Sequence, residues 1–99
     1  MEKFSYRVFN HQDEVLLAIA DKSILGMTFE DGDLSITVSD FYAGRACDSG
    51  EALKLIKRAT IVNAVGREII ALLIREKCVG KDSVLKIGDM PHAQIVAFR

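Results

Sequence analysis

The sequence predicts an α+β fold, a two-layer sandwich in which two helices, one of them long, pack on one face of a mainly antiparallel sheet of about five strands. Three observations predict it. Strand-like segments with two-residue periodicity come first and last, helix-like segments are grouped in the middle, and no linker or internal repeat divides the chain. With 99 residues, we expect a single domain over residues 1–99.

The predicted strands combine alternating polarity with β-branched and aromatic residues. Phe4–Phe9 and Glu14–Ala20 flank a polar turn, which predicts a hairpin. Glu14–Ala20 is apolar on both faces, as expected of a central strand. An acidic Asp-Gly turn precedes Leu34–Val38, which alternates cleanly. After the helices come two more predicted strands, Val84–Ile87 and His92–Phe98, joined by a turn over Gly88–Pro91.

Helices are predicted between these strands. Asp21–Gly26 resembles a single helical turn, with Asp21 as its cap and Gly26 ending it in a left-handed conformation. A helix then opens at Asp48, with Glu51 three residues later in the capping-box pattern. The long helix is predicted over Ala59–Val79, where aliphatic residues at helical spacing cover about half the circumference. Such a wide apolar arc predicts cover on more than one side of the helix.

Composition excludes several classes of protein. The chain is 49% hydrophobic and 27% charged, which is typical of a globular domain and not of a disordered segment. No apolar run approaches the ~18–20 residues of a membrane helix, and the N-terminus lacks the apolar block of a signal peptide, so we expect a cytoplasmic protein. Cys47 and Cys78 lie far apart and form no CxxC pair, so we expect free thiols, no metal site and no cofactor.

The net charge of −1 hides a difference between the two halves of the chain. Residues 1–50 carry four Lys/Arg and nine Asp/Glu, a net of −5, whereas residues 51–99 carry nine and five, a net of +4. This asymmetry is consistent with an anionic partner or with a mixed solvated surface.

Chemically interesting side chains gather near the predicted C-terminal turn. Asp89, His92 and Gln94 lie there, and Asn63 and Arg67 come from the end of the predicted long helix that we expect to meet this turn. His92 titrates near neutrality and could act as an acid or base, yet spacing names no nucleophile, so no catalytic residue is assigned. The alternatives are ligand binding and hydrogen bonding to backbone at the edge of the sheet.

Two adjacent aromatic residues, Phe41 and Tyr42, precede Gly44 in a predicted loop. Aromatic pairs of this kind either close the end of a core or provide a platform on which a base or ring stacks. We therefore include Tyr42 among the candidate ligand-binding residues.

Four segments of the chain resemble the archaeal family known as domain of unknown function 424. They are PHAQ at Pro91–Gln94, the most specific, DKSILGMTFEDGDLSITVS at Asp21–Ser39, FYAG at Phe41–Gly44, and RATIVNAVG at Arg58–Gly66. The resemblance implies an archaeal cytoplasmic protein with a two-layer α/β sandwich and brings no established activity. It also implies an association with translation, because such proteins are often encoded beside translation-initiation genes. The two cysteines do not match family features.

Three functional hypotheses follow. The first is a non-enzymatic module that binds RNA or a ribonucleoprotein, such as the ribosome or a translation factor, with Lys54, Lys57 and Arg58 as RNA contacts. The second is a protein–protein interaction subunit, for example a homodimer formed through Glu14–Ala20 or the apolar arc of the long helix. The third is a small enzyme that uses His92 with Asp89 or Asp40.

Overall fold

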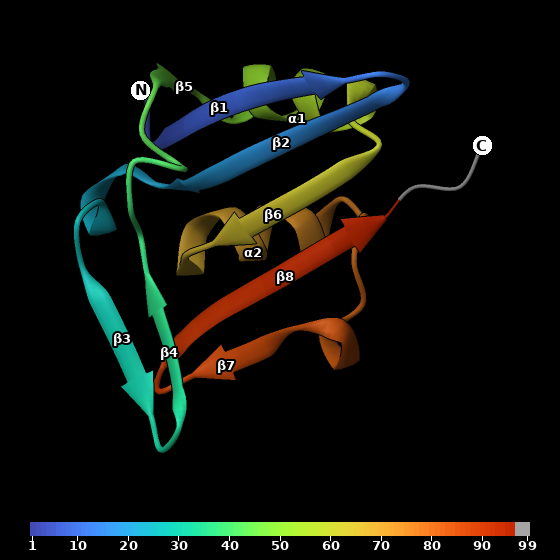
Figure 1. Cartoon of the computed structure of the whole chain (residues 1–99). Coiled ribbons are helices and arrows are strands. Elements are labelled where there is room, and N and C mark those ends of the chain that lie inside the picture. Colours follow the sequence, from blue (N-terminus) through green and yellow to red (C-terminus); the bar gives the residue numbers. More distant parts are fainter. Residues whose placement is uncertain (97–99) are drawn as a thin grey trace.

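A computed structural model of the chain describes residues 1–96 and shows an α+β fold. Two helices lie behind a six-stranded sheet, and a separate two-stranded hairpin crosses one end of its other face (Figure 1). The strands are β1 (Phe4–His11), β2 (Glu14–Asp21), β3 (Thr28–Asp31), β4 (Leu34–Thr37), β5 (Arg45–Cys47), β6 (Ile61–Val65), β7 (Leu85–Ile87) and β8 (Met90–Val96). The helices are α1 (Ser49–Arg58) and α2 (Arg67–Arg75), with short 3-10 turns at η1 (Lys22–Ile24) and η2 (Lys81–Ser83).

The large sheet has the order β5-β1-β2-β6-β8-β7. All its pairs are antiparallel except β2 with β6, which are parallel. A parallel pair needs a crossover connection. Here the connection between β2 and β6 contains the β3–β4 hairpin, β5 and α1. The predicted hairpin of the first two strands is confirmed, and β2 is a central strand, as its two-sided apolar pattern predicted.

The sheet separates two apolar clusters, because side chains alternate between its faces. On the helix face, Leu17, Ile19, Val62, Ala64 and Ala93 pack with buried residues of α2. On the other face, Ala18, Ala20 and Val65 pack with residues outside the six-stranded sheet. Those residues are Ile24, Val38 and Tyr42, with partly buried Phe29, Ile36 and Phe41 at the margin.

The predicted long helix over Ala59–Val79 is wrong. Its first part is strand β6 and its second part is α2, a helix of nine residues. The aliphatic residues of the predicted wide arc belong to two elements, a strand that is covered on both faces and the amphipathic helix that follows it. Other parts of the same chain cover the apolar faces of both elements. Central β2 is also covered on both faces, and neither feature offered for self-association is left exposed along its length.

Asp21 does not cap the short turn that follows it. Its side chain makes no capping hydrogen bond to η1 and instead accepts from the backbone N–H groups of Glu68 (2.9 Å) and Ile69 (2.8 Å), capping α2 across the sheet. Gly66 precedes this helix with φ 129°, a conformation in which a Cβ would lie 2.4 Å from Cγ of Asp21. Asp21 and Gly66 together fix where β6 ends and α2 begins.

The other predicted element boundaries lie closer to those in the structure. Asp48 caps α1 as predicted, accepting from the N–H of Glu51 at 2.9 Å, and Gly26 has the predicted positive φ of 85°. Arg45–Cys47, for which no strand was predicted, forms edge strand β5 against β1. Met90 and Pro91, predicted as turn residues, belong to β8, and the predicted strand end at Phe98 lies outside the described residues. Within residues 1–96, no helix has the length and apolarity needed to cross a membrane.

Candidate functional site

The sheet face away from the helices carries a polar network at its centre. The Tyr42 hydroxyl donates to Oδ1 of Asn63 at 2.6 Å, and Nε2 of His92 lies 3.0 Å from the same oxygen. A carbonyl oxygen only accepts, so Nε2 of His92 carries the proton and Nδ1 is the unprotonated nitrogen of the neutral ring. One amide oxygen thus joins a loop, β6 and β8.

Tyr42 reaches this network across β2. Its backbone carbonyl accepts from the Ser5 hydroxyl on β1 at 2.8 Å, while its own hydroxyl reaches Asn63 on β6. The strand between them presents Ala18 and Ala20, both fully buried in the cluster that contains Tyr42. Small side chains on β2 make room for the ring, and Tyr42, 4% exposed, closes this end of the core instead of presenting a stacking surface.

The stacked aromatic pair on this face is Phe41 with Phe9. Their ring centroids are 5.2 Å apart with an interplanar angle of 12°, and the Arg7 guanidinium lies 4.6 Å from the centroid of Phe9. Arg7 also donates to the carbonyl of Asp40 at 3.1 Å. The two aromatic rings therefore stack on each other, and the arginine makes a cation–π contact with one of them, all within the chain.

Gln94 lies directly opposite Asn63 in the β6–β8 register and is exposed. In residues 1–96 the side chains hold no buried polar atom without a hydrogen-bond partner, so the remaining amide and imidazole nitrogens of the network face solvent. The network satisfies its buried atoms, but His92 bonds to the Asn63 side chain on an inner strand and not to backbone at the edge of the sheet, as the structural alternative expected.

Burial lowers the pKa of His92, which gives a test of the network. Because the folded state holds the neutral ring more strongly than the unfolded chain, the contribution of His92 to stability is present above its unfolded pKa of 6.5 and is lost as pH falls through the folded pKa. We expect a titration of the imidazole carbon and nitrogen signals by NMR to give a His92 pKa below 6.5. A value at or above 6.5 would contradict the burial of the ring.

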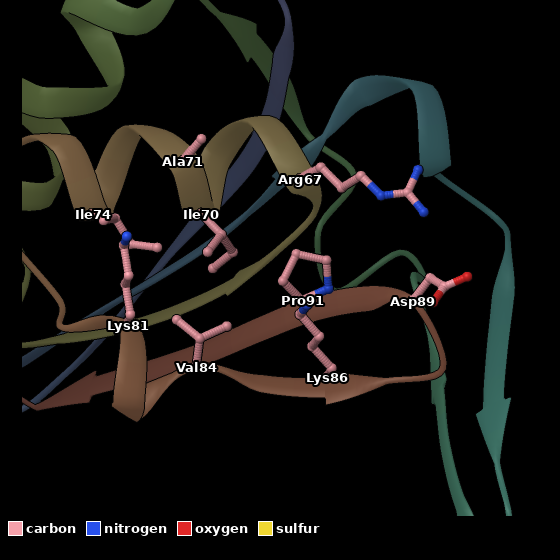
Figure 2. A pocket seen from close by; sticks show the side chains of 9 residues that line it. All are labelled: Arg67, Ile70, Ala71, Ile74, Lys81, Val84, Lys86, Asp89 and Pro91. Atoms are coloured by element: carbon pink, nitrogen blue, oxygen red, sulfur yellow. The ribbon is translucent and has the colours of Figure 1, made fainter.

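A cavity of about 600 Å³ lies on the opposite face of the sheet, between α2 and the β7–β8 hairpin (Figure 2). Its lining combines an apolar floor with charged side chains at the margin. The apolar residues are Ile70, Ala71, Ile74, Val84 and Pro91, and the charged residues are Arg67, Lys81, Lys86 and Asp89. The only ion pairs within residues 1–96 are Lys3–Glu68 and Arg75–Glu76, so no described carboxylate lies within 4.0 Å of the three pocket cations.

Local sequence explains how these charges are presented. Arg67 is the first residue of α2, and Lys86 pairs with Pro91, which puts both side chains on the helix face of the hairpin. Asp89 follows Gly88, whose φ of 64° makes the tight β7–β8 turn. Lys81 belongs to η2, which returns the chain from α2 to β7.

The predicted site residues fall into two groups on opposite faces of the sheet. Asn63, His92 and Tyr42 are joined by hydrogen bonds, with Gln94 beside Asn63, whereas Arg67 and Asp89 line the cavity. The enzyme hypothesis required His92 to converge with Asp89 or Asp40. Asp89 lines the cavity on the other face, and the described hydrogen bonds of Asp40 are those that its carbonyl accepts from Arg7 and from the N–H of Ala43.

The predicted RNA-contacting residues Lys54, Lys57 and Arg58 are exposed on α1, in the same layer as α2. Lys57 is close enough to Cys78 to oppose the rise in pKa that burial and Glu76 produce at that thiol. Lys57 on α1 therefore lies near Cys78, which follows the C-terminal end of α2.

Sequence reasoning missed Lys81 and the apolar floor as parts of a site. An available signal was the unbalanced charge of the second half of the chain, which includes Lys81 and Lys86.

The two cysteines are free. Burial, together with the carboxylates of Glu51 and Asp48, raises the pKa of Cys47 to about 11, so this thiol stays protonated at neutral pH. Within residues 1–96, no three His, Cys, Asp or Glu side chains gather in a way that could hold a metal ion.

Comparison with known proteins supports the fold and identifies the family. The crystal structure of an uncharacterized conserved protein from Methanopyrus kandleri matches with a TM-score of 0.80 over 97% of this chain and 94% of that chain, at 22% identity. No curated protein matches the sequence. The family model described as "Protein of unknown function (DUF424)" matches residues 9–98, and the chain belongs to this family.

Proposed function

We propose that the protein is a non-enzymatic module that binds RNA or a ribonucleoprotein of the translation apparatus through its helix layer. The observation that carries this proposal is a set of three cations around an apolar cavity, Arg67, Lys81 and Lys86, which form no ion pair with any residue in the described part of the chain, 1–96. Cations that neutralise phosphates supply most of the affinity for nucleic acid, and an apolar floor suits the face of a base.

The helix layer supports RNA binding better than the open sheet face does. The same helix layer carries three further exposed cations on α1, which are Lys54, Lys57 and Arg58. On the sheet face, by contrast, Tyr42 is buried and the Arg7 guanidinium already contacts Phe9 and the carbonyl of Asp40. The link to translation rests on the gene neighbourhood that the family resemblance implies.

Fluorescence anisotropy with a labelled single-stranded RNA and with transfer RNA tests the proposal. We expect binding at low salt that weakens steeply as salt is added. The double variant Lys81→Ala/Lys86→Ala should lower the affinity and reduce the slope of log K against log salt by roughly 1.4, since each single-strand phosphate contact contributes ~0.7. A control with the same loss of charge, Lys22→Ala/Arg45→Ala, alters two exposed cations away from the cavity and should bind nearly as well as the wild type.

Two results would overturn RNA binding by this surface: no detectable binding at low salt, or equal losses in the two double variants. A pull-down from the host, with and without ribonuclease, then distinguishes the partner. Retention of ribosomal or translation-factor proteins that ribonuclease abolishes is the expected result. Protein partners that persist after ribonuclease would indicate a protein–protein module instead.

A further inference from the structure

The cavity under α2 has two chemically different ends. Arg67, at the start of α2, and Asp89, in the β7–β8 turn, lie at one end, and Lys81 lies at the other beside Ile74 (Figure 2). Between them, Ile70, Val84 and Pro91 form the apolar middle, and Lys86 rises from β7 toward Pro91 (Figure 2). The helical rise from residue 67 to residue 74 is about 10 Å. That span is comparable to the distance between the base and the phosphate of one nucleotide.

Asp89 is the feature that a simple phosphate site does not explain. Its carboxylate would repel a phosphate at that end of the cavity, and it has no ion-pair partner among residues 1–96. An ionised carboxylate only accepts hydrogen bonds and can accept two side by side. A ligand that suits this end must therefore present neighbouring N–H donors and a neutral ring.

Guanine is the base whose edge meets this requirement. Its ring N–H and its exocyclic amino group are adjacent donors, so both can bond to one carboxylate. Adenine and cytosine each place a ring nitrogen acceptor beside the amino group, and uracil places its single N–H between two carbonyl oxygens. Arg67, at the same end, is suited to a guanine as well, because guanidinium groups bond to the carbonyl and ring nitrogen of this base or stack on its plane.

We infer that the cavity binds one guanine nucleotide unit and distinguishes it from other bases through Asp89. The base lies against Ile70 and Pro91 with its donors on Asp89, and the phosphate lies toward Lys86 and Lys81. The inference rests on the proposed RNA-binding function, because it concerns the same cavity. The shared chemistry, a guanine base joined to a phosphate, is found in a free nucleotide and in a guanosine within an RNA chain.

Calorimetry with guanosine and adenosine monophosphates and with inorganic phosphate tests the inference directly. We expect the guanine nucleotide to bind roughly tenfold more tightly than the adenine nucleotide, as is usual for a bidentate base contact, and phosphate alone to bind more weakly than either. Asp89→Asn replaces one acceptor with a donor and should remove most of this preference while leaving the melting temperature unchanged. Asp82→Asn, an exposed carboxylate outside the cavity lining, is the matched control and should keep the preference.

RNA oligonucleotides separate the two sources of the ligand. A uridine oligomer with one internal guanosine should bind more tightly than the all-uridine oligomer if the site takes guanine within a chain. Equal binding of the two oligomers, with a preference for the free guanine nucleotide, would assign the site to the free nucleotide.

The inference and the proposed function fail in different ways. Equal affinities for the guanine and adenine nucleotides, no binding of either, or a preference that survives Asp89→Asn would overturn the inference. In any of those cases, loss of RNA affinity in Lys81→Ala/Lys86→Ala would still support RNA binding. Guanine nucleotide binding without RNA binding would overturn only the proposed function.

Discussion

Replacing Gly66 with alanine is expected to destabilise the protein by roughly 4 kcal/mol or more, which is exceptional for a single methyl group. Gly66 has φ 129° and ψ 151°, a region essentially restricted to glycine, where other residues cost about 1–3 kcal/mol. The added Cβ would also lie 2.4 Å from Cγ and 2.6 Å from Oδ2 of Asp21. The carboxylate would have to leave its two N–H donors on α2, with the loss of a buried cap.

Urea denaturation of Gly66→Ala measures this loss. Gly80→Ala is the matched control, since Gly80 has an ordinary φ of −85° and open space around the site of its Cβ, and it should change stability by less than about 0.5 kcal/mol. Asp21→Ala/Gly66→Ala should cost less than the sum of the single variants, because removal of the carboxylate relieves the clash but not the backbone strain. Strict additivity would show that the two residues do not interact.

The sequence predicted the fold class but misplaced a strand within a helix. Ile61–Val65 has β-branched residues at three of five positions, which favours a strand, yet the aliphatic spacing continues into Arg67–Arg75 and also fits a helical period. Gly66 marks the true boundary, but an isolated glycine is also tolerated within helices. The partner that makes this boundary unavoidable is Asp21, about 45 residues earlier in the chain, and no local pattern connects the two.

The candidate site was predictable in part. Asn63 and His92 were grouped with Gln94 near one turn, and Tyr42 was a separate candidate in a loop. The structure brings these four residues together, although on a sheet and not beside a helix end. Arg67 and Asp89 are separated from them because Arg67 begins α2, which lies on the other face of the sheet, and Asp89 lies in the β7–β8 turn beside the cavity. The cavity itself could not be predicted, since it exists only because β7 and β8 fold back along α2.

Replacing Asn63 with alanine is expected to cost roughly 2–4 kcal/mol, because it removes the shared acceptor and leaves the buried hydroxyl of Tyr42 without a partner. Gln94→Ala is the matched control on the same face, directly opposite Asn63 but exposed, and should change stability by less than about 0.5 kcal/mol. The free energy of unfolding from urea titrations at pH 7.5 measures both. An Asn63→Ala variant as stable as Gln94→Ala would show that the network contributes nothing.

Two further variants separate loss of the hydrogen bonds from loss of packing at Asn63. Tyr42→Phe should destabilise the wild type but should cost little in the Asn63→Ala background, where its hydroxyl has already lost its acceptor. Asn63→Asp keeps an oxygen that accepts from both Tyr42 and His92, and its negative charge favours the imidazolium, so it should retain most of the stability and raise the pKa of His92 above that of the wild type. If the His92 pKa instead stays unchanged in Asn63→Asp, the imidazole does not bond to residue 63 in solution, and the network must be rebuilt around Tyr42 alone.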